Sequence, residues 1–347
     1  MLPFCTRVER MCSTHVYLKQ REKSMNRSII KQLGISAVVT LSFCLASTSY
    51  AAGMKIAIIA PSASNDLAFT QSMVDAANAL KDEYELEIAV TDGTFVVDDA
   101  AAAIRDYAKQ GFDVVIAHGS QYGGSLKEIA PDFPETAFTW GTSADTFGLP
   151  NVSSYEAKSD QGGYVMGVMA GAMTKSNVVG VVGPIEVGDA KLYVDGFAAG
   201  VTANNADAKV NINYIGSFGD VALAAEAGKA HIANGADVMT GTAQMVVGAV
   251  GAARSENVAW FGTQANQTKL GKKVVVASQV YKWEVVLRTI FDNAKAGNLG
   301  GDQHEITFAN GGLVMEFNDN YPLDAEVKAA GEAAIAGIIS GDIKMVH

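Results

Sequence analysis

Cysteine is scarce in this 347-residue chain, and its distribution excludes two kinds of chemistry. The three cysteines are Cys5, Cys12 and Cys44, so residues 52–347 contain none. The sequence therefore predicts neither disulfide bonds nor thiol catalysis in that part of the chain. Proline is also rare, with seven residues, which argues against long proline-rich linkers between folded parts.

Long hydrophobic runs are missing as well, apart from one near the N-terminus. Residues 33–46 are apolar, follow the basic residues Arg27 and Lys31, and precede the small residues Ser49 and Ala51. This pattern is typical of a secretory signal peptide, because the run is too short to span a membrane. We expect a leader over residues 1–51, cleavage after Ala51, and a mature protein in the periplasm.

Two details of the leader bear on its chemistry. The signal pattern begins at Met25, so translation is expected to start there, and a long basic segment before the apolar run is the alternative. Phe43 stands directly before Cys44 and is larger than the residue that a lipoprotein anchor site requires. We therefore expect no lipidation at Cys44.

Positive charge is in deficit once the leader is set aside. The formal net charge of the chain is −11, and residues 1–51 carry seven Lys or Arg against two Glu. Residues 52–347 therefore have a net charge of about −16. An acidic excess of this size argues against binding to nucleic acid or to an anionic membrane through bulk charge.

The sequence is rich in short Val- and Ile-rich runs that alternate with helical patterns. Such runs indicate strands buried on both faces, and the alternation indicates parallel sheets with right-handed crossovers. Strands are expected at 55–60, 85–92, 113–119, 136–141, 177–184, 209–217, 237–242, 258–263 and 273–280, with a further strand or connecting segment at 312–317. Helices are expected near 69–81, 97–111, 190–205, 283–297 and 324–340, with others between 119 and 136 and up to residue 234.

The series of strands starts again after residues 151–163, which predicts an α/β fold of two doubly wound lobes. A chain of this length also exceeds what one core usually serves. Ligands of open parallel sheets bind beyond the carboxyl ends of the strands. Those ends carry small or polar residues, and one of them starts at Gly241. If the two lobes face each other, these loops line one cleft.

Catalytic motifs are lacking at the predicted strand ends. The chain has no nucleotide-phosphate loop, no nucleophile elbow, no GxGxxG segment and no spacing typical of a metal site. His118 is the one histidine at a strand end, and a lone histidine there more often makes a structural hydrogen bond than acts as a base. Binding is therefore favoured over catalysis, with His118 kept as a candidate contact.

Aromatic residues on the strand-end loops favour a binding site. Phe69 and Phe218 lie on loops of opposite lobes, where two rings would hold a planar ligand between them. Each stacked ring would contribute about 0.5–1.5 kcal/mol beyond area burial. The alternative is that both rings are core residues. Trp140 is a candidate for the wall of the cleft or, equally, for a core position.

Polar residues at the same loops have two interpretations. Asn65 and Asp66 precede a helix, so one is expected to cap it and the other to bind a ligand. Asp189 and Asp220 also precede helices, and capping is the favoured interpretation for both.

Five segments match one known family when they are taken together. They are NDLAFTQS (65–72), GGYVMGVMAGAMTKSNVVGVVGP (162–184), DGFAAGV (195–201), YIGSFGD (214–220) and IANGADVMTGTAQMVVGAVGAA (232–253). They resemble segments of the basic membrane protein family of periplasmic binding proteins, the purine nucleoside receptor type. The resemblance covers residues 54 to about 320.

This resemblance implies a type I periplasmic binding protein fold and a small-molecule ligand. It also implies delivery of a nucleoside or related ring compound to an ABC permease in the inner membrane. We expect a monomer without a cofactor. One lobe is predicted to comprise residues 54–155 and 283–311, and the other residues 156–282 and 312–347. Chain crossings near residues 155, 281 and 312 would form the hinge.

The resemblance also assigns positions to the ligand site. It places an aromatic clamp at Phe69 and Phe218 and a loop carboxylate at Asp66. The family's asparagine after the loop phenylalanine is Thr70 in this chain, and its base-contacting acid falls at Trp140 and Gly141.

Two more departures concern the sugar of a nucleoside. Gln264 and Asn266 stand where the family has acids, and the family's lysine falls near Tyr281 or Lys282. A hydrogen bond to a charged group is worth about 1.5–3 kcal/mol, against about 0.5–1.5 for a neutral one. The two changes would weaken a ribose clamp about tenfold or more. Purine nucleoside remains the first expectation, with a nucleobase or another ring or sugar-like compound left open.

Two other functions remain as alternatives. A nucleoside hydrolase on the same scaffold would need His118 as its base, assisted by Asp66. A receptor that senses a sugar-like solute would use the same cleft for signalling instead of transport.

Overall fold

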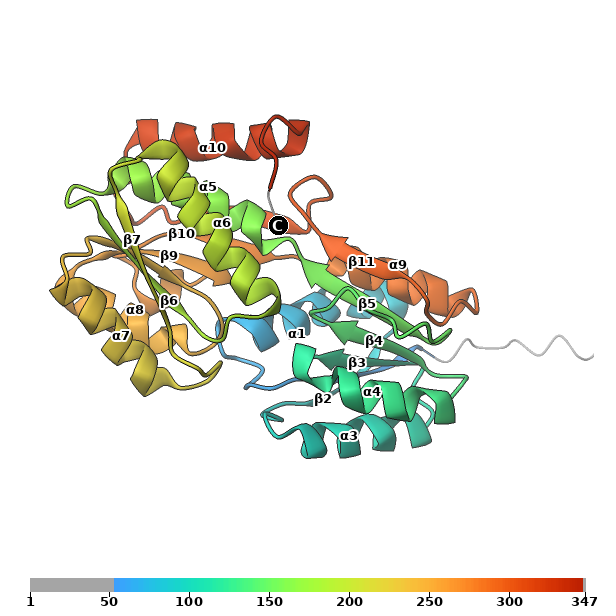
Figure 1. The fold of residues 1–347 in the computed structure, drawn as a ribbon. Coiled ribbons are helices and arrows are strands. Elements are labelled where there is room, and N and C mark those ends of the chain that lie inside the picture. The colour runs from blue at the N-terminus through green and yellow to red at the C-terminus, as the bar shows by residue number, and fades with distance from the viewer. Residues whose placement is uncertain (1–52, 346–347) are drawn as a thin grey trace, which may run out of the picture. The chain divides into compact units, whose positions relative to one another are not determined.

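The Val- and Ile-rich runs form two six-stranded sheets in the computed structural model, which describes residues 53–345 (Figure 1). The expectations for the leader, including the start at Met25 and the state of Cys44, concern residues outside this range. Each sheet and its helices is called a lobe below. The first lobe contains the sheet that begins the chain, and the second lobe contains the other.

The first sheet is parallel throughout. Its order places β1 in the interior of the sheet, between β3 and β2. The strands in spatial order are β11 (Gln303–Ile306), β5 (Val152–Ala157), β4 (Ala137–Gly141), β3 (Val114–His118), β1 (Lys55–Ile59) and β2 (Glu87–Thr91).

The second sheet has the same order of strands along the chain, with one antiparallel edge. Its edge strand β12 pairs antiparallel with β10, and the other pairs are parallel. The strands in spatial order are β12 (Leu313–Phe317), β10 (Val275–Tyr281), β9 (Ala259–Gln264), β8 (Val238–Gly241), β6 (Val178–Gly183) and β7 (Lys209–Tyr214). The two doubly wound lobes predicted from the sequence are therefore present.

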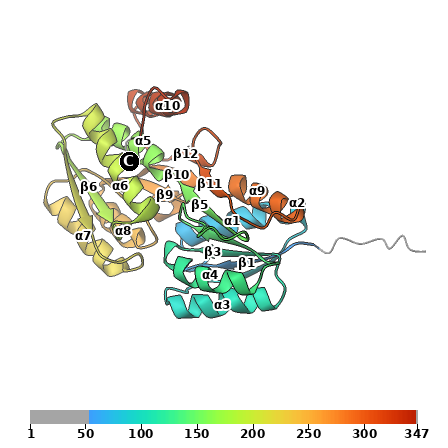
Figure 2. The ribbon, with the colours of Figure 1, turned by 45° about the vertical axis from the view of Figure 1, so that its right-hand side comes forward.

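Helices cover both faces of each sheet, as Figure 1 and Figure 2 show. In the first lobe α3 (Val97–Lys109) and α4 (Gly123–Ile129) lie on one face, and α1 (Phe69–Ala79), α2 (Lys81–Tyr84) and α9 (Glu284–Lys295) on the other. In the second lobe α7 (Val221–Ala233) and α8 (Val246–Glu256) lie on one face, and α5 (Ser159–Met173), α6 (Gly188–Asn204) and α10 (Ala325–Ser340) on the other. Short 3₁₀ turns occur at Ser120–Tyr122, Ala130–Asp132 and Thr268–Leu270.

Two strands were missed by the sequence analysis. The segment 151–163 was interpreted as the point where the series restarts, but it contains β5 and the start of α5. In β5 the polar residues Ser153 and Ser154 are buried, which hides the strand from a search for apolar runs. β11 is a short edge strand with the partly polar sequence QHEI. The two misses have different causes, because β5 has buried polar residues and β11 is short, polar and largely exposed.

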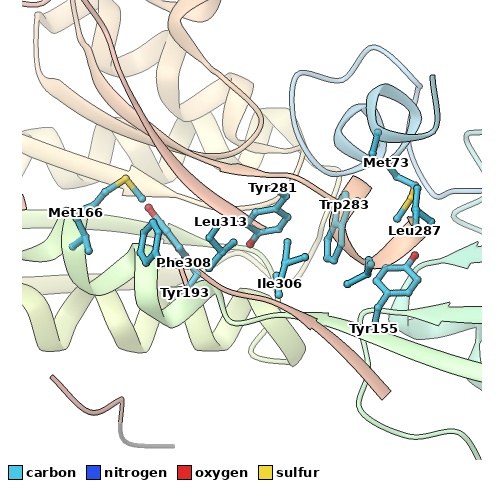
Figure 3. Close-up of a cluster of buried hydrophobic side chains, with 14 of the residues drawn as sticks. Met73, Tyr155, Met166, Tyr193, Tyr281, Trp283, Leu287, Ile306, Phe308 and Leu313 are labelled. Atoms are coloured by element: carbon cyan, nitrogen blue, oxygen red, sulfur yellow. The ribbon is translucent and has the colours of Figure 1, made fainter. Parts of the chain in front are cut away.

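One hydrophobic cluster extends through both lobes. It runs from Met73 on α1, past Tyr155 and Trp283, to Met166 on α5 (Figure 3). Trp283 is fully buried, and its ring meets the ring of Tyr155 edge-on with centroids 5.0 Å apart. The chain passes between the lobes at these residues, so apolar packing connects the two sheets at the crossing points.

Glycines bring α5 and α6 into close contact in the second lobe. A Cβ placed on Gly163, Gly167, Gly196 or Gly200 would lie 2.1–2.4 Å from a backbone oxygen of the other helix. The two helices therefore pack backbone against backbone. This fixes the first turn of α6, where Asp189 lies, against the start of α5, and Ser159 Oγ donates a 2.6 Å hydrogen bond to the Asp189 carbonyl.

The described part of the chain has no helix that is long and apolar enough to cross a membrane.

Candidate functional site

A cavity lies where the carboxyl ends of both sheets meet, and we call it the interlobe cavity. It contains about 430 Å³ of free space, part of which is open to solvent. The first lobe contributes Pro61, Phe69, Phe95, Gly119, Ser120, Gln121 and Thr142, and the second contributes Val187, Asp189, Ala190, Phe218, Ala243, Gln244 and Gln264. Gln264 ends β9 and the others follow strands or begin helices, as the rule for open parallel sheets requires.

Phe69 is the first residue of α1 and lines the interlobe cavity. The residue is 8% exposed, and its ring packs on the imidazole of His118. Phe218 is half-buried, follows β7 and lines the same cavity from the second lobe. The two rings predicted as a clamp are thus both placed at the cavity, one from each lobe.

His118 supports the site from behind and is not among the residues that line the cavity. It is fully buried, with Nδ1 2.7 Å from the Tyr155 hydroxyl and Nε2 3.1 Å from the Phe69 carbonyl oxygen. Burial lowers the pKa of His118 to about 3, so the ring is neutral at physiological pH. Both nitrogens already have partners, which weakens the hydrolase alternative. A direct ligand contact by His118 stays a prediction.

Asp66 organises the loop before α1. Its Oδ1 accepts hydrogen bonds from the amides of Ala68 and Gln71, and its Oδ2 accepts from the amide of Thr70 and the hydroxyl of Ser62. This is the capping role that the sequence allowed for one of the two polar residues. Asn65 is exposed. Neither lines the interlobe cavity, so their ligand contacts remain predictions.

Four other predicted contacts are not among the residues that line the interlobe cavity, namely Thr70, Trp140, Gly141 and Gly241. The hydroxyl of Thr70 is buried against Ser62 Oγ at 2.7 Å. The indole of Trp140 donates to the Gly119 carbonyl at 3.2 Å and stacks on Phe147. Gly141 and Gly241 are buried at strand ends, where Cβ atoms would collide with Tyr155 and with the Val182 carbonyl. Contact of these four with a ligand stays a prediction.

Gln264 joins the interlobe cavity to a second, more polar one. It lines both, while Asn266 and Lys282 line only the second. Asn266 donates to Glu316 Oε2 at 2.7 Å, and Lys282 Nζ lies 3.7 Å from Glu316 Oε1. The carboxylate of Glu316 therefore holds both the Asn266 amide and the Lys282 ammonium group, and their contact with a ligand stays a prediction.

Asp189 was expected to cap α6, and that expectation is wrong. Its Oδ1 accepts a 3.0 Å hydrogen bond from Thr142 of the other lobe, and its Oδ2 lies 3.4 Å from the Tyr281 hydroxyl. Burial raises the pKa of Asp189 to about 6. Asp220, by contrast, does cap α7, because its Oδ1 accepts from the Leu223 amide at 2.9 Å.

Phe95 is a second lining residue that the sequence analysis missed. It follows β2 and is 46% exposed at the edge of the interlobe cavity. A Cβ on Gly219 of the other lobe would lie 2.9 Å from the tip of its ring. The sequence signal that could have identified it is a phenylalanine in the polar loop segment TDGTFVVDD, directly after a predicted strand.

Metal chemistry has no support in residues 53–345, where no cluster of three or more His, Cys, Asp or Glu side chains has a geometry that could hold an ion.

Comparison with known proteins identifies the family of this chain. The family described as Bmp, ABC transporter substrate-binding protein PnrA-like, matches residues 54–342. The chain is 24% identical over 270 residues to the transcriptional activator protein Med of Bacillus subtilis, covering 78% of this chain and 83% of that protein. It is 26% identical over 301 residues to the ABC transporter nucleoside-binding protein BmpA of Lactococcus lactis, covering 80% and 85%.

A solved structure shows the same fold. It is an ABC transporter solute-binding protein from Conexibacter woesei, with a TM-score of 0.70 and 24% identity, covering 85% of this chain and 99% of that one. The type I binding-protein fold predicted from the sequence is confirmed.

Proposed function

Because the chain belongs to the Bmp family of PnrA-like ABC transporter substrate-binding proteins, we propose that it captures a purine nucleoside or related ring compound for import. The observation that carries this proposal is the pair of rings, Phe69 and Phe218, placed at one cavity by opposite lobes. A flat ligand between them would bury both of its faces, and aromatic stacking adds to the gain from apolar burial.

The remaining lining is suited to the edges of such a ligand. Ser120, Gln121, Thr142, Gln244 and Gln264 present hydroxyl and amide groups, and Asp189 presents a carboxyl group. A few polar groups in an otherwise apolar pocket fix the orientation of a ligand and give specificity. Gln264 stands where the resemblance implies an acid, so a ribose would be held by neutral hydrogen bonds.

Closure of the two lobes would give the transport signal. We propose residues 54–155 and 283–311 as one moving body, residues 156–282 and 312–347 as the other, and the crossings near 155, 281 and 312 as the hinge. A ligand that contacts both lobes favours the closed arrangement, because the open one offers it contacts from only one lobe. The closed form would then dock on an ABC permease of the inner membrane as a periplasmic monomer.

Calorimetry on purified protein tests the proposal. Guanosine, inosine, adenosine, their free bases and a set of sugars would be titrated, and we expect saturable 1:1 binding of at least one purine compound. Mass spectrometry of material extracted from the fresh protein gives an independent readout of what the cavity holds. If no ring compound of the set binds and the extract contains none, the proposal fails.

A further inference from the structure

We propose that Asp189 selects ligands that present adjacent N–H donors, so that the interlobe cavity discriminates in favour of a guanine-type edge. This inference rests on the proposed function and deepens it. It concerns a residue outside the aromatic clamp and outside the positions that the family resemblance assigns.

The first observation is the charge of the lining. Among the described residues that line the interlobe cavity, Asp189 is the one ionisable side chain. It is 7% exposed, so it is shielded from solvent while it faces the cavity. An ionised carboxylate accepts hydrogen bonds and donates none.

The second observation is that the carboxylate has unused capacity. Thr142 donates to Oδ1 at 3.0 Å, and within residues 53–345 the one other side chain that bonds to the carboxylate is Tyr281, whose hydroxyl lies 3.4 Å from Oδ2. A carboxylate offers about four lone-pair directions, so several remain for a ligand. The Thr142 contact also fixes the carboxylate across the two lobes, which places it in a defined position when they close.

The third observation is a second acceptor at the same cavity. Gln264 is 3% exposed, and its Oε1 has no hydrogen-bond partner among the described residues. Leaving a buried acceptor unpaired costs about 1–3 kcal/mol. Two buried acceptors of this kind, one charged and one neutral, call for a ligand that donates.

The two buried acceptors, Asp189 and Gln264, fit the hydrogen-bonding edge of guanine better than that of hypoxanthine. Guanine carries a ring N–H next to an exocyclic amino group, so a carboxylate can accept two parallel hydrogen bonds, the geometry that makes such pairs strong. Hypoxanthine has the ring N–H but lacks the amino group. The two compounds, and likewise guanosine and inosine, therefore form a matched pair that differs in the one donor at issue.

The groups around Asp189 set the pH range in which its carboxyl group is ionised and can discriminate between ligands. Tyr281 on β10 and Tyr155 and Glu156 on β5 are the other titratable groups that act on it, and both tyrosines stay neutral because burial raises their pKa values well above the usual range. Together with desolvation, Glu156 raises the pKa of Asp189. The carboxyl group is ionised at pH 7.5 and protonated at pH 5, where it loses part of its capacity to accept.

Calorimetric titration of guanosine and inosine at pH 7.5 tests the inference. The wild type is expected to bind guanosine roughly ten- to hundredfold more tightly than inosine, the ratio for a charge-assisted hydrogen bond. Asp189→Asn should reduce the preference to about fivefold, because an amide makes a neutral bond. Asp195→Asn is the matched control, since Asp195 lies on the same helix with an exposed side chain and should leave the ratio unchanged.

The outcomes separate this inference from the proposed function. Equal binding of the two nucleosides by the wild type, or an unchanged preference in Asp189→Asn, overturns the inference and leaves the proposed function standing. Absence of binding of every ring compound by the wild type overturns both. Should Asp189→Asn fail to fold, the wild-type preference measured at pH 7.5 and pH 5 decides, because it must fall on acidification.

Discussion

The imidazole of His118 lies parallel to the phenyl ring of Phe69, with ring centroids 3.8 Å apart and planes 10° from parallel. One face of Phe69 is thereby covered by the first lobe, and the residue also lines the interlobe cavity. His118 also holds the loop through its hydrogen bond with the Phe69 carbonyl. The ring is thus fixed in orientation before any ligand arrives, which reduces the entropy lost on binding.

The first prediction concerns this ring. Phe69→Leu keeps an apolar side chain on His118 but removes the stacking surface, so the dissociation constant for guanosine should rise at least two- to tenfold. Phe133→Leu is the control, because Phe133 packs against the hydrophobic core of the first lobe and does not line the cavity. An unchanged dissociation constant in Phe69→Leu would show that the ligand does not lie on this ring.

The second prediction is acid sensitivity caused by His118. Its pKa is about 3 in the folded protein, against about 6.5 when unfolded, so the unfolded chain binds a proton first. The stability that the neutral ring contributes is therefore complete above pH 6.5 and is lost as the pH falls toward 3. Between pH 7.5 and 4.5 the free energy of unfolding should fall by about 2–3 kcal/mol more in the wild type than in His118→Gln.

Urea unfolding of both proteins at the two pH values measures this difference. Asp189 acts in the opposite direction, because its raised pKa means that protonation below pH 6 relieves a burial cost in the folded state. Asp189→Asn should therefore lose more stability on acidification than the wild type. Equal pH dependence of wild type and His118→Gln would contradict the assignment to His118.

The third prediction concerns the contact of α5 with α6. A Cβ on Gly196 would lie 2.3 Å from the Asp160 carbonyl oxygen, so Gly196→Ala should lower the free energy of unfolding by about 1–3 kcal/mol. The matched control is Gly251→Ala on α8, where no atom lies within 4 Å of the new Cβ. Alanine there should raise stability by about 0.5–1 kcal/mol through helix propensity. Thermal denaturation compares the two variants directly, and equal effects would exclude a steric cause.

The fourth prediction assigns a kinetic role to Phe95. Its ring reaches across to Gly219 of the other lobe at the edge of the cavity, so it covers an exit path. Phe95→Ala should release guanosine severalfold faster in stopped-flow displacement and leave the association rate nearly unchanged. Val96→Ala alters the neighbouring residue, which is 59% exposed and does not line the cavity, and should have no effect.

The fold was largely predictable because several of its central strands are apolar and buried on both faces. Runs such as 113–119 and 177–184 could hardly be anything but buried parallel strands, and the structure has β3 and β6 there. β5 was missed because Ser153 and Ser154 are buried within it, so the strand lacks the unbroken apolar run that marks the others.

The site was predictable only in part, for a related reason. Phe69 and Phe218 were predicted because they follow strands, Gln264 was predicted through the family resemblance, and all three line the cavity. Asp189 has the local sequence of a helix cap, yet its hydrogen bonds go to Thr142 and Tyr281, 47 and 92 residues away. Tertiary packing determines which hydrogen bonds such a carboxylate makes, and the neighbouring residues in the sequence do not predict that packing.

The hydrophobic cluster that passes through Tyr155 and Trp283 couples the unfolding of the two lobes. Since the halves share one apolar interior, melting of either should destabilise the other, and heating should give a single calorimetric peak. A ligand bound in the interlobe cavity would then shift that one peak, because binding to the native state alone raises the melting temperature of the protein. A dye-based thermal melting screen could therefore rank candidate ligands of this protein before it is known which lobe contacts them.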